Sequence, residues 1–455
     1  MTSEILPAGG RGAVVQLLRR LHFYIGLFVG PFIFLAALTG TAYVLTPQLE
    51  NAWYASTLFV TPQGEAQPLS RQVEAARHYA GPAEPFYAVR PAPGPQDTTR
   101  VQFADPELGA SRSRAVFINP YTLAVTGDMP VYGTSGILPL RTWIDEFHRS
   151  LQLGVFGRNY SELAASWMWV AAVGGMLLWW QTRVKKRLNG PVRGAKARTR
   201  HWHIVLGLTL LVGMVFFSAT GLTWSRWAGG NIDTLRSELG WMTPQVSTSL
   251  TADGTPTPMD PHAMHHMQGG MVMAGPVQDW DKVLAAARQA GISANKIEIR
   301  PPKKMGTAWT VTEINRAWPT QVDAVSVNPS NFQIVDAVHF ANFPLVAKLT
   351  RWGIDAHMGI LFGLANQILL AVFGLALCVL IALGYRQWWL RRPARSEQPL
   401  SAAWTALPGG PRIAVAVCAA ALGYCLPVMG VSLVAFLAVD VLRSYLARSR
   451  LVLSE

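Results

Sequence analysis

Four histidines recur at matched positions along the chain, and their surroundings recur with them. His22 and His203 each follow arginines. A glycine comes four residues after each, and a Thr-Gly pair ends eighteen residues after. His148 and His357 each have tryptophan five residues before, glycine six residues after, and a Trp-Trp pair that begins 31 residues after. We therefore interpret the chain as an internal duplication in which each half supplies two histidines.

Axial ligation of haem is the chemistry that suits these histidines. Charged loops place His22 and His203 at the inner face of a membrane, and His148 and His357 at the outer face. Imidazole near a bilayer core is costly unless it is paired or ligated. Four histidines at two depths cannot form one tetrahedral zinc site, whereas two pairs suit two bis-histidine haems. Because no Cys-x-x-Cys-His sequence is present, the predicted cofactors are two non-covalent haems b.

A plainer interpretation is that these are interfacial histidines that hydrogen-bond between helices, but two matched pairs favour haem. His201 competes with His203 for the inner site, although only His203 has the repeated offsets. Glycines one turn after a histidine would let a flat macrocycle approach the backbone, and nearby arginines would pair with propionates. These predicted haem contacts are Gly26, Gly207, Arg19, Arg20 and Arg200.

Three acids beside the outer histidines admit two interpretations. Asp145, Glu146 and Asp355 either orient the imidazoles as hydrogen-bond partners or are solvated acids favoured at the start of a helix. Their sequence positions do not separate these alternatives.

Residues 259–273 combine histidine and methionine, and imidazole with thioether suits copper. The candidate segment has no counterpart in the first half of the chain, so a flexible insertion is the alternative. The candidate copper ligands are His262, Met264, His265, His266 and Met267.

Composition indicates a membrane protein. Of the 455 residues, 50% are hydrophobic and only 14% are charged, which is low for a soluble protein. Residues 183–200 carry eight Lys or Arg and no acid between two apolar runs. That is the positive-inside pattern of a cytoplasmic loop, so the net charge of +13 does not indicate nucleic-acid binding. Arginines before the first apolar run place the N-terminus inside as well.

The apolar runs predict four long transmembrane helices in two helix–domain–helix repeats, followed by a C-terminal helical hairpin. Two exported α+β domains separate the helices of each repeat. In each domain an amphipathic helix precedes strands rich in β-branched and aromatic residues. The predicted helices of these domains are residues 70–79 and 280–290, and the strands are 86–90, 100–103, 115–118, 296–300, 309–314 and 324–327.

The predicted boundaries follow from these runs and from the basic loops. They are 1–46 for the cytoplasmic N-terminus and first helix, 47–142 for the first exported domain, 143–182 for the second helix, 183–200 for the cytoplasmic loop, 201–226 for the third helix, 227–350 for the second exported domain with its 259–273 insertion, 351–390 for the fourth helix, 391–411 for a cytoplasmic linker and 412–445 for the hairpin.

Residues 15–395 resemble the PepSY-associated transmembrane-helix proteins of bacterial inner membranes. The marks are Leu21-His22 to Thr39-Gly40, the Asn119-Pro120-Tyr121-Thr122 turn, His148 to Gly154 with Trp179-Trp180, and the second copies of these motifs. The resemblance implies PepSY-like exported domains, His22, His148, His203 and His357 as ligands of b-type haems, and similarity to iron-regulated ferric-siderophore reductases. The second copy departs from the pattern, because Asn328-Pro329-Ser330 lacks the Tyr-Thr.

We therefore predict a multi-pass inner-membrane oxidoreductase that moves electrons outward to a ferric siderophore or another ferric chelate in the periplasm. No Gly-x-Gly-x-x-Gly follows a strand, so the electron donor is a quinol or a cytoplasmic reductase. Two alternatives remain: a non-redox PepSY protein that binds or regulates a periplasmic partner, and a copper-handling redox protein that uses residues 259–273.

Overall fold

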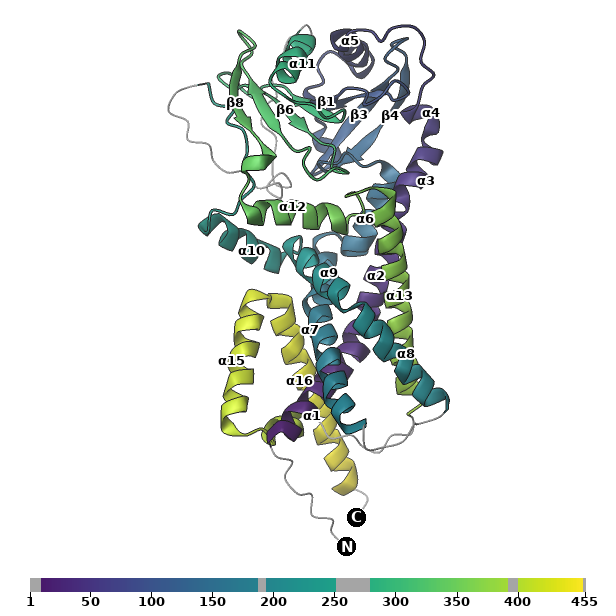
Figure 1. The fold of residues 1–455 in the computed structure, drawn as a ribbon, viewed down its shortest axis with the longest axis vertical. Coiled ribbons are helices and arrows are strands. Elements are labelled where there is room, and N and C mark those ends of the chain that lie inside the picture. Colours follow the sequence, from purple (N-terminus) through teal and green to yellow (C-terminus); the bar gives the residue numbers. More distant parts are fainter. Residues whose placement is uncertain (1–9, 187–193, 251–278, 392–399, 453–455) are drawn as a thin grey trace. The chain divides into compact units, whose positions relative to one another are not determined.

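The computed structural model describes residues 10–186, 194–250, 279–391 and 400–452. The chain divides into two compact units. The helical unit comprises Met1–Ala42, Glu146–Leu235 and Leu369–Glu455, and the sheet unit comprises Tyr43–Asp145 and Arg236–Ile368. Figure 1 labels most of the helices and strands of both units.

Within the described residues, three helices are long and apolar enough to cross a membrane: Gly12–Val44, Gly154–Gln181 and Leu364–Trp389. Two further helices, α8 (Ala195–Thr209) and α9 (Leu211–Thr223), meet at a bend of 56° and make a fourth span if they act as one broken helix. The chain is thus a multi-pass membrane protein.

Both helices that carry an inner histidine are irregular shortly after it. The first span consists of α1 (Gly10–Tyr24), the π-helical turn η1 (Ile25–Val29) and α2 (Gly30–Val44). The π turn ends seven residues after His22, and the break between α8 and α9 falls seven residues after His203. Because π turns and breaks are frequent at functional sites, this shared distortion points to the region around the two histidines.

The outer histidines do not lie on the membrane-spanning helices, which corrects the predicted helices 143–182 and 351–390. Each lies on a short helix that ends before the span begins. The chain turns at Gly154 (φ 55°) and Gly363 (φ 57°), a backbone conformation that glycine adopts without steric cost. The short helices are α6 (Pro139–Ser150) and α12 (Leu345–His357), and the longer helices after them are α7 (Gly154–Lys186) and α13 (Leu364–Trp389).

A buried glutamate of α7 holds the short helix that follows the broken span. Glu162 is fully buried, and its carboxylate accepts hydrogen bonds from the backbone nitrogens of Trp227 at 2.9 Å and Ala228 at 3.1 Å. These are the first residues of α10 (Trp227–Glu238), where a negative charge is favoured by the helix dipole.

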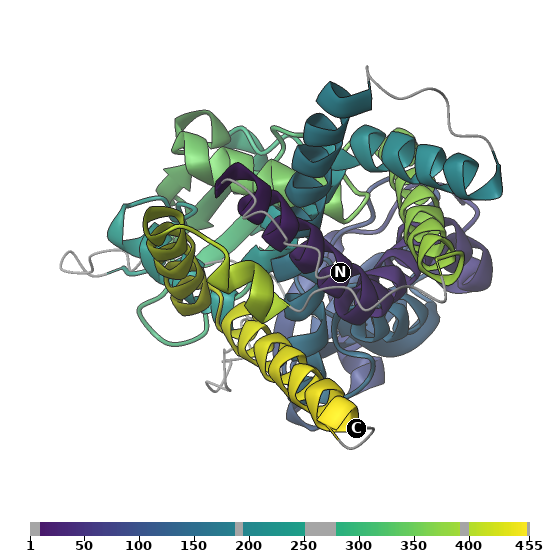
Figure 2. The same ribbon diagram turned by 90° about the horizontal axis from the view of Figure 1, so that it is seen from below.

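The C-terminal segment folds as two contacting helices, α15 (Gly409–Cys425) and α16 (Pro427–Val452). They approach closely where a Cβ added to Gly430 would lie 2.9 Å from the Cα of Gly423. This pair corresponds to the predicted hairpin at residues 412–445. Figure 2 shows α16 running to the C-terminus.

A buried carboxylate joins α16 to the first span. Asp440 is 2% exposed and accepts hydrogen bonds from the hydroxyl of Tyr24 and from the backbone nitrogens of Leu400 at 2.9 Å and Ser401 at 3.0 Å. Leu400 and Ser401 begin α14 (Leu400–Thr405). The C-terminal helices are therefore integrated into the helical unit.

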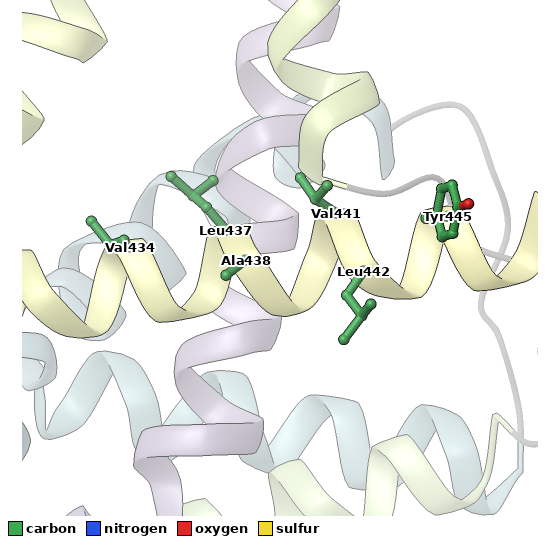
Figure 3. A pocket seen from close by; sticks show the side chains of 6 residues that line it. All are labelled: Val434, Leu437, Ala438, Val441, Leu442 and Tyr445. Carbon is green, nitrogen blue, oxygen red and sulfur yellow. The ribbon is translucent and has the colours of Figure 1, made fainter.

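One side of α16 is apolar and exposed. Figure 3 shows six side chains that line an open groove of about 690 Å³ there. Such a surface is more favourable in lipid than in water, in keeping with a helix at the membrane. The lining residues are Val434, Leu437, Ala438, Val441, Leu442 and Tyr445.

The two segments between the helices of each repeat form one continuous sheet, which corrects the prediction of two separate α+β domains. Its eight strands are antiparallel in the order β4-β3-β2-β1-β5-β6-β7-β8. The halves meet where β1 pairs with β5, with Val89 opposite Ile299, so each half covers the other's open edge. The strands are β1 (Phe86–Arg90), β2 (Thr99–Phe103), β3 (Arg112–Ile118), β4 (Val125–Tyr132), β5 (Ile297–Arg300), β6 (Trp309–Glu313), β7 (Ala324–Val327) and β8 (Ile334–Val338).

Both halves also share one hydrophobic core beneath two helices, α5 (Leu69–Ala80) and α11 (Trp280–Gln289). The ring centroids of Phe86 and Trp280 lie 5.4 Å apart across the halves. Asp281 of α11 accepts hydrogen bonds from the first backbone nitrogens of α5, so each half completes the other. The remaining short elements of the sheet unit are α3 (Thr46–Trp53), α4 (Ala55–Leu58), η2 (Pro106–Leu108) and η5 (Phe340–Asn342).

A buried ion cluster lies at the seam between β1 and β5. Glu298 is 5% exposed and accepts hydrogen bonds from Nε of Arg90 at 2.7 Å and Nε of Arg300 at 2.6 Å. Burial opposes ionisation of Glu298, but the two arginines outweigh it and lower its pKa to about 2.

We expect Glu298→Gln to lower the unfolding temperature of the full-length protein in detergent, because two buried guanidinium groups lose their counter-charge at a cost of about 3 kcal/mol. Since the folded pKa is depressed from 4.5 to about 2, this stabilisation is present above pH 4.5 and lost as the pH falls towards 2. The difference between wild type and variant should shrink over that window.

Asp128→Asn provides a matched control. Asp128 pairs with Arg114 at 2.7 Å, but both side chains are partly exposed, so we expect a change of less than about 1 kcal/mol. If Glu298→Gln and Asp128→Asn lowered the unfolding temperature equally, the buried cluster would not be the main ionic contact of the seam.

Candidate functional site

His22 and His203, from different halves of the repeat, face each other in the helical unit. Their ring centroids lie 6.4 Å apart, and the ring planes cross at 80°. A metal–imidazole bond is about 2 Å long and the ring centroid lies about 1 Å beyond the nitrogen, so two imidazoles on opposite sides of one metal have centroids about 6 Å apart. The observed separation fits that arrangement.

Hydrogen bonding leaves one nitrogen of His203 available. Its Nδ1 lies 3.1 Å from the carbonyl oxygen of Leu380. A carbonyl can only accept, so Nδ1 carries the proton and Nε2 carries the lone pair that a metal needs. In His22, Nδ1 is buried and has no hydrogen-bond partner among the described residues. A buried unpaired nitrogen calls for an explanation, and a bound group would provide one.

Each ring rests on a glycine of a neighbouring helix. A Cβ on Gly175 of α7 would lie 3.1 Å from Cε1 of His22, and one on Gly384 of α13 would lie 3.4 Å from Cε1 of His203. A side chain at either position would therefore press on the ring. Both glycines follow the outer histidine of their own half by 27 residues. The sequence analysis missed them, although this equal offset was a usable signal.

His148 is held by the Thr-Gly pair of the first span. Its Nδ1 lies 3.0 Å from Oγ1 of Thr39. The Thr39 hydroxyl donates to the carbonyl oxygen of Leu35 at 2.7 Å, so its oxygen accepts from Nδ1–H and Nε2 stays unprotonated. A Cβ on Gly40 would lie 3.1 Å from Cε1 of His148. Burial lowers the pKa of His148 to about 4, so its ring is neutral at pH 7 and able to bind a metal.

His357 belongs to the sheet unit, where it ends α12, whereas His148 belongs to the helical unit. Two residues before His357, Asp355 is 3% exposed. Its carboxylate accepts hydrogen bonds from Nε of Arg316 at 2.6 Å and Nε of Arg351 at 2.9 Å. Asp355 is thus a buried counter-ion, and its interpretation as a solvated acid is wrong.

The other predicted residues have mixed surroundings. Asp145 and Glu146 lie half-buried on α6, and their role towards His148 stays a prediction. The ring of His201 lies against Trp202, with centroids 5.8 Å apart, and not opposite His22. The predicted haem contacts differ in burial: Arg20 is buried, Gly207 is half-buried, and Gly26, Arg19 and Arg200 are exposed. The competing His201 is exposed as well. The candidate copper ligands His262, Met264, His265, His266 and Met267 lie outside the described residues.

A facing pair of imidazoles can complete the coordination of a metal that brings its other ligands with it. Among the described residues, no group of three or more His, Cys, Asp or Glu could hold a bare metal ion. The porphyrin of a haem supplies four nitrogens and leaves two axial positions for imidazole. The His22–His203 pair therefore fits the predicted haem.

The duplicated sequence motifs, the apolar spans and the shared sheet define a multi-pass membrane protein whose two halves contribute to one sheet. The family model of the PepSY-associated TM region matches residues 19–391. The chain belongs to this family, as its motifs predicted. No curated protein matches it.

We expect Gly175→Val to push the His22 ring away from His203, because even a Cβ at this position lies 3.1 Å from the ring. Purified protein should then retain about one haem fewer per chain than wild type, measured by the pyridine haemochrome assay. Gly384→Val should act in the same way through His203.

Gly410→Val is the control, since a Cβ at Gly410 meets nothing within 4 Å, and it should keep the wild-type haem content. Membrane insertion of each variant is checked by detergent extraction and gel filtration. A folded Gly175→Val protein with unchanged haem content would exclude His22 as a ligand.

Proposed function

We propose that the protein is a di-haem b oxidoreductase of the bacterial inner membrane that reduces ferric chelates in the periplasm for iron acquisition. The observation that carries this proposal is the His22–His203 pair, with ring centroids 6.4 Å apart and a glycine against each ring. Both features suit bis-histidine ligation of a haem within an apolar helical unit.

His22 and His203 would hold the first haem. A haem with two imidazole ligands supplies a one-electron carrier whose iron has no open coordination position. The surrounding residues do the positioning: Gly175 and Gly384 set how deep each ring lies, and the Leu380 carbonyl selects the tautomer of His203.

His148 and His357 are proposed as the ligands of the second haem, on the strength of the repeated motifs. The hydrogen bonding of His148 supports its part, because Thr39 accepts from Nδ1–H and leaves Nε2 unprotonated. Thr220 and Gly221 stand at the same offsets after His203 as Thr39 and Gly40 do after His22.

The proposed substrate is a ferric chelate such as a ferric siderophore. One electron converts its iron to the ferrous state, which oxygen-rich chelators hold more weakly. A quinol releases two electrons and two protons as it becomes a quinone, so one quinol would serve two chelates; a cytoplasmic reductase is the other donor proposed. The proposed orientation places the N-terminus in the cytoplasm and the exported segments in the periplasm, following the basic loops.

We expect dithionite-reduced protein, freed of excess reductant, to be reoxidised when mixed anaerobically with a ferric siderophore. A ferrous-specific chelator should develop colour at one ferrous ion per electron lost, followed by stopped-flow absorbance. Deletion of residues 259–273 should leave the rate within about two-fold of wild type, because the segment has no counterpart in the repeat.

Two results would contradict this function. Reduced protein that ignores every ferric chelate tested is not a ferric-chelate reductase. Reoxidation by cupric ion alone, lost on deletion of residues 259–273, would instead establish the copper-handling alternative.

A further inference from the structure

Two buried polar groups lie together at the end of the first span. Tyr43 of α2 is 6% exposed and Arg141 of α6 is 9% exposed. The Arg141 guanidinium carbon lies 4.5 Å from the centroid of the Tyr43 ring, and both residues belong to the sheet unit. Apart from their contact with each other, the Tyr43 hydroxyl and the Nε and Nη2 atoms of Arg141 have no hydrogen-bond partner among the described residues.

A guanidinium cannot relieve its own burial by losing a proton, since its pKa exceeds 12 in proteins. A stacked ring satisfies the face of the cation and leaves the N–H edge without acceptors. Buried charges are normally paired, so the buried, unpaired N–H edge of Arg141 calls for an anion.

The acids buried in the sheet unit do not supply that anion. Glu50 lies within electrostatic reach of Arg141, but no hydrogen bond joins their side chains in the described part of the chain. Each acid has other partners. Asp355 binds Arg316 and Arg351, Glu298 binds Arg90 and Arg300, Glu50 accepts from the backbone nitrogen of Leu138 at 3.1 Å, and Glu313 accepts from the backbone nitrogens of Ser293, Ala294 and Asp323. Asp145, one turn after Arg141 on α6, lies within electrostatic reach of Tyr43, yet Nε and Nη2 of Arg141 stay without an acceptor among the described residues.

The pair is not a product of the duplication. Counted from the matching histidines, the second half has Thr350 in place of Arg141 and Trp224 in place of Tyr43. The repeated fold therefore forms without this pair, so a property of the first half alone must account for a buried arginine there.

We propose that Arg141 and Tyr43 form a carboxylate-binding site, in which Nε and Nη2 of Arg141 receive the carboxylate side-on and the Tyr43 hydroxyl donates a further hydrogen bond. Two parallel N–H groups match the two oxygens of a carboxylate. Arg141 and His148 are seven residues apart on α6, two turns along one helix face. The carboxylate is thus either a haem propionate, which rests on the proposed function, or a soluble carboxylate such as citrate.

The first arm of the test measures the haems of full-length wild-type, Arg141→Gln, Arg141→Lys and Tyr43→Phe proteins in detergent. Loss of a positive charge beside a propionate should lower the midpoint potential of one haem, because the ferric state is then less disfavoured. Arg141→Lys should restore part of the shift, and Tyr43→Phe should give a smaller shift of the same sign.

The second arm titrates citrate into the same proteins by calorimetry. Suppose that wild type binds citrate, that Arg141→Gln and Tyr43→Phe bind it at least ten-fold more weakly, and that the haem potentials are unchanged. The site then binds a soluble carboxylate. A potential shift without citrate binding assigns it to a propionate. If purified wild type contained no haem, the proposed function would be contradicted. The citrate titration would still show whether Arg141 and Tyr43 bind a carboxylate.

Arg77→Gln is the matched control. Arg77 also lies over an aromatic ring, with its guanidinium carbon 3.7 Å from the Phe86 centroid, and also has unpaired Nε and Nη2 atoms. It has no tyrosine hydroxyl beside it and should change neither readout. Two results would overturn the proposal. In the first, Arg141→Gln and Tyr43→Phe have the haem potentials and the citrate affinity of wild type. In the second, Arg77→Gln changes these quantities as much as Arg141→Gln does.

Discussion

The helical unit is organised around two imidazoles that face each other inside an apolar environment. A polar ring in such a place is costly unless hydrogen bonds or a ligand satisfy its nitrogens. His203 uses one nitrogen on the Leu380 carbonyl, and Nδ1 of His22 is buried without a hydrogen-bond partner among the described residues. The 6.4 Å between the ring centroids leaves space for one metal centre, so a bound group would satisfy what the protein alone does not.

Duplication explains how the chain positions this pair. Within each half, a glycine of one helix supports the histidine of another: Gly175 supports His22, Gly384 supports His203, and Gly40 supports His148. The pairing of His22 with His203 then joins the two halves. The two halves are also joined in the sheet unit. β1 of the first half pairs with β5 of the second in one sheet, and the shared core buries aromatic residues from both halves. Neither half buries its own surfaces completely, so the fold of the sheet unit requires both copies.

Sequence periodicity predicted six of the eight strands of the described sheet, because alternation and turn residues are local signals; Phe86–Arg90 and Ala324–Val327 match their predicted bounds. The two end strands, Val125–Tyr132 and Ile334–Val338, were not predicted. It did not predict the joined sheet, since pairing of Val89 with Ile299 is a contact between distant segments that no local pattern encodes. Hydropathy placed the spans but merged the short helix of His148 with the span after it, because a turn at Gly154 leaves hydropathy unchanged. The repeat offsets identified the four histidines. The supporting glycines and the buried Arg141–Tyr43 pair appear only when side chains meet in space.

The most direct measurement of the central claim is the haem content and the reduced-minus-oxidised spectrum of the purified protein and of three histidine variants. The account predicts about two haems b per chain in wild type, loss of about one in His22→Ala and in His203→Ala, and no loss in His201→Ala, whose exposed ring lies away from His22. A wild-type protein with clearly less than one haem per chain, or retention of the full content without His203, would contradict it.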